Sequence, residues 1–272
     1  MPELPEVETT LKGIRPWLVG QQIEVVNVFN HAMRWPIPTA VYDLVGQQIC
    51  EVRRRAKYLL IQLSNHSHLI LHLGMSGVIR VLEHDEVYAK HDHFELILNN
   101  GKSLRLNDPR RFGCVLLADD KDINQHPLLS QLGPEPLSET FDGRWLKQLA
   151  KNRKVAVKNF IMNNHTVVGV GNIYAAESLF LAGIRPDKKA SSISLKKYHE
   201  LADVIKKVLS RAIAVGGTTL KDFKDAEGKP GYFKQALNVY GRAGEVCVQC
   251  DATINNIIIG QRASCYCPNC QK

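Results

Sequence analysis

Pro2 and Glu3 are residues that could carry out covalent chemistry. Once Met1 is removed, Pro2 becomes the N-terminus and its nitrogen a free secondary amine, whereas an interior proline nitrogen is a non-nucleophilic amide. An α-amino group has a pKa near ~7.7–8, so a sizeable fraction is unprotonated at neutral pH. Attack on an aldehyde or a sugar C1′ would give a cationic iminium, with Glu3 beside it to hold or move protons. The alternative is structural, because Pro5 and Glu6 suit the first turn of a helix.

Four cysteines near the C-terminus are spaced as two pairs that could share one metal ion. The pairs are Cys247 with Cys250, and Cys267 with Cys270. Four thiolates complete a tetrahedral shell with no open position, which is typical of structural rather than catalytic zinc. Cys265 could offer a competing ligand, but Cys267 and Cys270 mirror the first pair. Residues 254–259 predict a strand and residues 260–262 a turn, so we expect a two-stranded zinc finger. Arg262 would lie near its tip, where it suits a groove or a phosphate.

A glycine-rich turn, Gly169-Val170-Gly171, precedes a helix that is predicted to begin near Asn172. Backbone N–H groups at such a turn and helix start attract anions, and a DNA phosphate fits them. No strand is predicted before the turn and no third glycine follows, so the motif is not a dinucleotide-binding fingerprint. A simple helix N-cap is the alternative role for Asn172.

Two predicted strand-to-turn segments, residues 72–77 and 108–113, would expose Met75, Arg110 and Phe112. An apolar wedge with an arginine could fill the gap left when a base is pushed out of a duplex. By default Met75 and Phe112 would belong to the core. Lys57, at the start of a predicted strand, could contact phosphate or act as an acid near the Pro2 amine; the alternative is a solvated strand end.

The length, charge and cysteine content of the chain are consistent with these motifs. The chain has 272 residues, enough for two domains with separate cores. Its net charge of +8, with basic residues gathered at 53–57 and 147–158, indicates a polyanionic partner. Five of the seven cysteines follow residue 246, which favours a metal over disulfides. No apolar run approaches the ~20 residues of a membrane span, so we expect a cytosolic protein without membrane contact.

Helical periodicity predicts a helix at 4–18 and a long helix from Leu195 to about Ala212, after a cap at Ser194. Between them, residues 23–118 show short alternating runs typical of an antiparallel β-sandwich or barrel. Asn99-Asn100-Gly101 is a hairpin turn signal, and residues 131–137 read as a linker.

Together these motifs resemble the bacterial formamidopyrimidine-DNA glycosylase family over the whole chain. The shared motifs, in order, are Pro-Glu-Leu-Pro-Glu (2–6), Arg-Arg-Ala-Lys-Tyr (54–58), His-Leu-Gly-Met-Ser-Gly (72–77), Lys-His-Asp-His (90–93), Asp-Pro-Arg-Arg-Phe-Gly (108–113), Gly-Val-Gly-Asn (169–172), Gly-Gly-Thr-Thr-Leu (216–220) and the zinc finger. The resemblance implies a bifunctional enzyme that excises oxidised purines, chiefly 8-oxoguanine and formamidopyrimidines, and then cuts the strand. An endonuclease VIII-like enzyme for oxidised pyrimidines is the alternative, but that branch typically starts Pro-Glu-Gly-Pro-Glu, so Leu4 favours purines.

The resemblance also implies a role for each site residue. Pro2 would attack C1′ of the damaged nucleotide, with Glu3 as the acid/base at the sugar. Lys57 would donate the proton for β-elimination, and Arg262 would serve the δ-elimination. The implied DNA contacts are His91, Arg110, Arg153, Lys158 and Asn172, with Met75, Arg110 and Phe112 filling the vacated stack. The expected cofactor is one structural Zn²⁺, and the expected partner is damaged double-stranded DNA.

The expected fold class is α+β. Residues 1–131 would form the catalytic β-sandwich domain with its N-terminal helix, and residues 132–216 a helix-two-turn-helix DNA-binding domain. Residues 217–238 would be a loop that caps the lesion, and residues 239–272 the zinc finger. The protein is expected to be a monomer without a nucleotide cofactor, cytoplasmic and associated with the bacterial nucleoid.

Overall fold

The computed structural model describes residues 2–217 and 237–272. They belong to two compact units, one ending at residue 130 and resuming at 215, the other comprising residues 131–214 and the C-terminal segment. We call them the first and the second unit and describe each by itself. The zinc-finger segment and the helices between residues 143 and 214 lie in the same unit. The predicted capping loop, 217–238, lies almost wholly outside the described residues.

The first unit begins with helix α1 (Leu4–Leu18), which confirms the predicted helix. Its buried face carries Val7, Leu11, Ile14 and Leu18, spaced so that one stripe of the helix faces the core. Glu3 is the N-cap residue, and its backbone N–H donates to Glu6 Oε2 at 2.8 Å. The Glu3 side chain in turn accepts the backbone N–H of Glu6, which forms a capping box. Each side chain thus satisfies a backbone donor that the hydrogen bonds of the helix leave unpaired.

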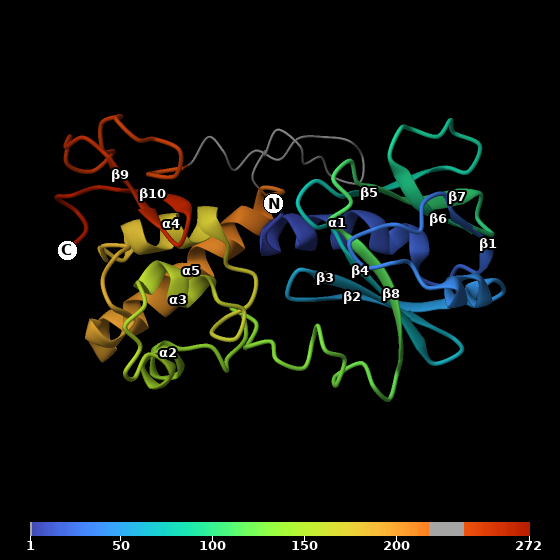
Figure 1. Ribbon diagram of the computed structural model, residues 1–272, viewed down its shortest axis with the longest axis horizontal. Helices are drawn as coiled ribbons and strands as arrows, with labels where there is room; N and C mark the ends of the chain where they lie inside the picture. Colours follow the sequence, from blue (N-terminus) through green and yellow to red (C-terminus); the bar gives the residue numbers. More distant parts are fainter. Residues whose placement is uncertain (1, 218–236) are drawn as a thin grey trace. The chain divides into compact units, whose positions relative to one another are not determined.

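Eight strands of the described first unit form two antiparallel four-stranded sheets, ordered β1-β6-β7-β5 and β2-β3-β4-β8 (Figure 1). Their bounds are β1 Ile23–Val28, β2 Ile49–Arg55, β3 Tyr58–Leu63, β4 Ser67–His72, β5 Val78–Glu83, β6 Asp92–Leu98, β7 Lys102–Asn107 and β8 Cys114–Asp119. Side chains from both sheets and from α1 share one buried core. The predicted sandwich is confirmed, as is the turn at 99–101, which joins β6 to β7. A short 3₁₀ helix, η1 (Thr39–Leu44), completes the unit.

The second unit is helical and ends in a hairpin (Figure 1). Its elements are α2 Gly143–Leu149, α3 Val157–Met162, α4 Asn172–Leu181, η2 Ala190–Ser192, α5 Leu195–Ala214, β9 Asn255–Ile259 and β10 Arg262–Tyr266. Helix α4 packs against both α5 and β10. The side chains of Ala176 and Phe180 therefore share a small core with Cys247 and Cys267. This mixture of helices and antiparallel sheets confirms the α+β fold. Across the described residues, none of the helices combines the length and apolarity needed to cross a membrane.

Candidate functional site

Pro2 and Glu3 lie together at the buried start of α1. Only 3% of Glu3 is exposed, and the Glu6 side chain that receives its N–H is fully buried. The backbone of Glu3 is therefore held by the first turn of the helix rather than being free to move. Pro5 and Glu6 therefore have the helix-entry role that the sequence allows, and Glu6 holds the backbone of Glu3, next to Pro2.

Lys57 lies in the turn between β2 and β3, and only 8% of it is exposed. The idea of a solvated strand end is therefore wrong. Its charge acts on His72, which lies on the neighbouring strand β4: burial first, and Lys57 second, lower the pKa of His72 to about 4. The imidazole is consequently neutral at physiological pH, and its Nδ1 accepts the Gly74 N–H at 2.9 Å. In its ammonium form, a lysine at this turn has a proton to donate.

Two turns of the first unit expose the predicted wedge residues. The exposed fractions are 38% for Met75 and 40% for Phe112, so neither belongs to the core. The Arg110 guanidinium lies over the Phe112 ring at 4.9 Å from its centroid, a cation–π contact. His91 is half-buried just before β6 and has a positive φ of 80°. The structure therefore presents an arginine and two apolar side chains outward.

Helix α4 begins at Asn172, as predicted, but its N-cap is Gly171. The N-cap role considered for Asn172 is therefore wrong by one residue. Within the described residues, Asn172 Oδ1 is buried without a hydrogen-bond partner. An unsatisfied buried oxygen is costly, and such atoms call for an explanation such as a ligand or an ordered water.

Lys158, expected to contact DNA, is fully buried on α3. Its Nζ donates to the Ala263 carbonyl at 3.0 Å and to Ser264 Oγ at 2.6 Å, both on β10. An ammonium enclosed by its own protein cannot reach a phosphate, so that expectation is corrected. Lys158 instead ties α3 to the hairpin strand that begins with Arg262. Arg262 itself is exposed at the hairpin turn, and Arg153 is exposed in the segment between α2 and α3.

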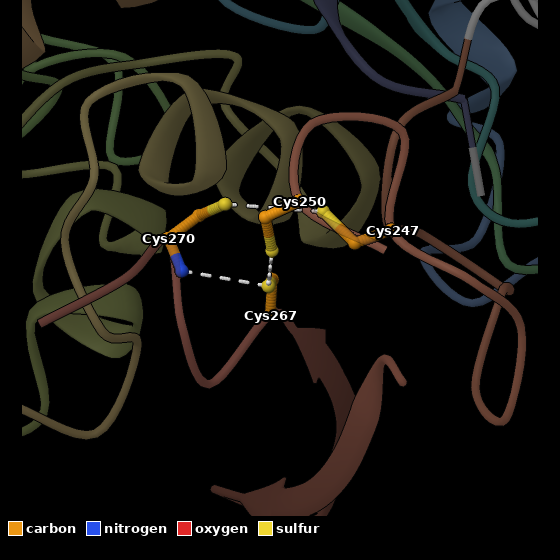
Figure 2. Close-up of side chains that lie close together, drawn as sticks. All are labelled: Cys247, Cys250, Cys267 and Cys270. Carbon is orange, nitrogen blue, oxygen red and sulfur yellow. Dashed lines mark hydrogen bonds between the residues drawn. The ribbon is translucent and has the colours of Figure 1, made fainter. Parts of the chain in front are cut away.

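The four cysteine sulfurs converge in the second unit, all within 4.8 Å of one another (Figure 2). Cys247 Sγ and Cys270 Sγ are 3.9 Å apart, and Cys250 Sγ and Cys267 Sγ are 3.4 Å apart. A tetrahedral zinc with Zn–S bonds of about 2.3 Å needs sulfurs about 3.8 Å apart, so the donors fit. Cys265 points elsewhere, with its sulfur 4.0 Å from Asn256 Oδ1. The set of four therefore excludes it.

Comparison with known proteins shows the family of this chain. Residues 1–115 match the formamidopyrimidine-DNA glycosylase N-terminal domain, residues 132–224 its H2TH domain, and residues 244–272 the zinc finger found in FPG and IleRS. The chain is 58% identical to formamidopyrimidine-DNA glycosylase of Alcanivorax borkumensis and 57% identical to that of Colwellia psychrerythraea, over the full length of each. It belongs to the formamidopyrimidine-DNA glycosylase family.

Solved structures of this family agree with the fold. A Lactococcus lactis FPG mutant bound to Fapy-dG DNA superimposes with a TM-score of 0.93 at 32% identity, covering all of both chains. The MutM (FPG) protein of Thermus thermophilus gives a TM-score of 0.89 at 35% identity, with 99% of this chain covered. For a formamidopyrimidine-DNA glycosylase with this finger, the four cysteines hold one structural zinc.

Sequence reasoning missed one residue of this glycosylase. Glu177 lies on α4, is only 2% exposed, and accepts hydrogen bonds from the backbone N–H groups of Asn238, Val239 and Tyr240. It thereby fixes the start of the segment that leads to the first cysteine pair. The available signal was a lone acidic residue within the apolar run 173–181, since a charge on a buried helix needs partners.

Proposed function

We propose that this chain removes oxidised purines, chiefly 8-oxoguanine and formamidopyrimidines, from duplex DNA and then cuts the strand at the resulting abasic site. The observation that carries the proposal is that Pro2 and Glu3 lie next to each other at the buried start of α1, in a chain that matches the glycosylase family throughout. The Lactococcus lactis relatives were crystallised with Fapy-dG DNA and with DNA containing an abasic site, which are a substrate and an intermediate of this reaction.

The first step uses the amine of Pro2 after Met1 has been removed. Its lone pair forms a bond to C1′ while the bond from C1′ to the base breaks, and the base leaves with that electron pair and takes up a proton. Opening of the sugar ring gives an iminium between Pro2 and C1′, and Glu3 acts as the acid/base at the sugar. The buried first turn of α1 keeps both groups in place for this exchange.

The iminium then acts as an electron sink that makes the C2′ proton acidic. Loss of that proton breaks the C3′–O bond, which is the β-elimination, and Lys57 donates a proton in this step. In the second, δ-elimination, loss of the C4′ proton breaks the C5′–O bond, and we assign Arg262 to this step. Cys247, Cys250, Cys267 and Cys270 would hold one zinc ion in a closed shell of thiolates, and the ion would stabilise the finger that carries Arg262.

DNA binding relies on contacts that do not read sequence. We assign DNA contacts to His91, Arg110, Arg153 and Asn172, and because contacts to the phosphates are electrostatic, affinity should weaken as salt rises. Met75, Phe112 and the Arg110 side chain fill the stack that the extruded base leaves. Damage is then selected by the base pocket and by the ease of extrusion. Such an enzyme acts as a monomer on chromosomal DNA, in the cytoplasm and at the nucleoid.

Excision assays on matched duplexes test this function. One duplex carries 8-oxoguanine opposite cytosine, a second carries thymine glycol, and a third is undamaged. We expect faster release of 8-oxoguanine, followed by strand cuts that leave phosphates on both sides of the gap. Faster release of thymine glycol would instead support the endonuclease VIII-like alternative. Tight DNA binding with no cleavage of any duplex would indicate a non-catalytic DNA-binding protein.

A further inference from the structure

A buried carboxylate in the first unit joins the two turns that expose the wedge residues. Asp108 is fully buried, and its Oδ1 accepts a hydrogen bond from Ser76 Oγ at 2.7 Å. The same oxygen lies 3.3 Å from the Arg110 N–H, and Oδ2 accepts the Gly113 N–H at 2.8 Å. One side chain thus binds residue 76 of the first turn and both ends of the second.

The backbones of the two turns are also in direct contact. Gly74 has a φ of +62°, and a Cβ added there would lie 2.4 Å from the Phe112 carbonyl carbon and the Gly113 nitrogen. A Cβ added to Gly113 would lie 2.6 Å from the His72 carbonyl oxygen. No side chain can be accommodated at either place without moving the main chain. The turns therefore fit together as one body rather than as two independent loops.

The backbone of Asp108 connects this body to a third element. Its N–H donates to the His91 carbonyl at 3.0 Å, and its carbonyl oxygen is 2.9 Å from His93 Nε2. His91 is one of the residues we assign to DNA. Through its main chain and side chain, Asp108 thus bonds to the turn that carries Met75, to its own turn with Arg110 and Phe112, and to the segment that carries His91.

We propose that Asp108 is a positioning residue that holds Met75, Arg110 and Phe112 at fixed separations, so that they enter the gap together. This inference rests on the proposed function. Filling the gap offsets the cost of unstacking and unpairing a base, which is a few kcal/mol. Side chains on turns that move independently would offset less of this cost, because ordering the turns would cost entropy at the moment of extrusion. A site that already lacks its base has less need of the wedge.

The role therefore predicts a selective defect. Asp108→Asn keeps the shape of the side chain but replaces one acceptor oxygen with a donor, which cannot receive both sets of hydrogen bonds. Excision of 8-oxoguanine paired with cytosine should slow by about tenfold or more, the loss expected for one charged hydrogen bond. Cleavage of a preformed abasic site by the same protein should stay within about threefold of wild type.

Single-turnover rates on these two substrates, measured with the full-length zinc-loaded protein, test the proposal. Asp119→Asn is the matched control, since Asp119 is exposed at the end of β8 and should leave both rates unchanged. Ser76→Ala removes one hydrogen bond to Asp108 and should show the same selectivity more weakly; it carries the test where Asp108→Asn fails to fold. Equal loss on both substrates, or no loss on either, would overturn the positioning role. A wild-type protein inactive on 8-oxoguanine would instead refute the proposed function itself.

Discussion

Glu177→Gln is the substitution whose effect follows most directly from the structure. Both carboxylate oxygens are used: Oε2 accepts the N–H and the side-chain Nδ2 of Asn238 at 2.9 and 2.8 Å. Oε1 accepts the N–H groups of Val239 and Tyr240, each at 2.9 Å. Four donors therefore converge on one buried charge, which joins α4 to the segment before the zinc finger.

The size of the effect follows from these four bonds. A glutamine retains one oxygen, so two of the bonds survive without the charge that strengthens them. Its amide group faces the other two donors and can accept from neither. Losing two hydrogen bonds to a charged acceptor costs about 1.5 kcal/mol each, so local opening should become easier by about 3 kcal/mol.

Hydrogen exchange measures this opening directly. The amide protons of Val239 and Tyr240 should exchange about 100-fold faster in Glu177→Gln, which corresponds to that free energy when exchange follows the opening equilibrium. Glu200→Gln is the control, because Glu200 is half-buried on α5 and its ion pair with Lys197 lies within the same helix. Unchanged protection of both amides in Glu177→Gln would refute the reasoning that this carboxylate anchors the segment.

Three further perturbations test other parts of the structure. Cys247→Ser should lose zinc, measured by metal analysis, together with DNA affinity, whereas the exposed Cys50→Ser should lose neither; full DNA affinity without zinc would contradict the finger's role. Lys158→Met should destabilise the second unit by about 2 kcal/mol in urea unfolding, because two hydrogen bonds to β10 are lost. It should also let the β-elimination product accumulate, because the strand carrying Arg262 loses its anchor. An unchanged ratio of β- to δ-elimination product would contradict this. The pKa of His72 is about 4 in the folded protein against ~6.5 in the unfolded chain, so protonation favours the unfolded chain. The contribution of the neutral His72 to the free energy of unfolding is therefore fully present above the unfolded pKa and falls by about 2.5 kcal/mol at pH 4.5. His72→Gln should lack that part of the acid sensitivity in urea titrations at pH 7 and 4.5.

Local signals explain what the sequence predicts well. Helix α1 follows from the spacing of Val7, Leu11, Ile14 and Leu18, because helical periodicity depends only on neighbours along the chain. The metal-binding set is likewise carried by two short repeats, and hairpin β9-β10 joins them. Exposure of Met75 and Phe112 could be inferred only from the motifs around them, since isolated apolar residues are ordinarily buried.

Long-range partners explain what the sequence does not reveal. Lys158 stands in a basic stretch that favours DNA contact, yet its ammonium binds Ser264, 106 positions away. Glu177 and Asp108 are similar, because an acidic side chain looks the same in sequence whether it faces solvent or several buried donors. The choice of Gly171 over Asn172 as N-cap is a shift of one residue, which periodicity cannot resolve.

Covalent trapping tests the central claim, that Pro2 is the nucleophile. The protein is incubated with a duplex containing 8-oxoguanine, the iminium is reduced with borohydride, and the adduct is digested and located by mass spectrometry. We predict a single adduct on the N-terminal peptide, at the nitrogen of Pro2, in molecules that have lost Met1. An adduct on Lys57 or another lysine, or no adduct with protein shown to begin at Pro2, would contradict the account.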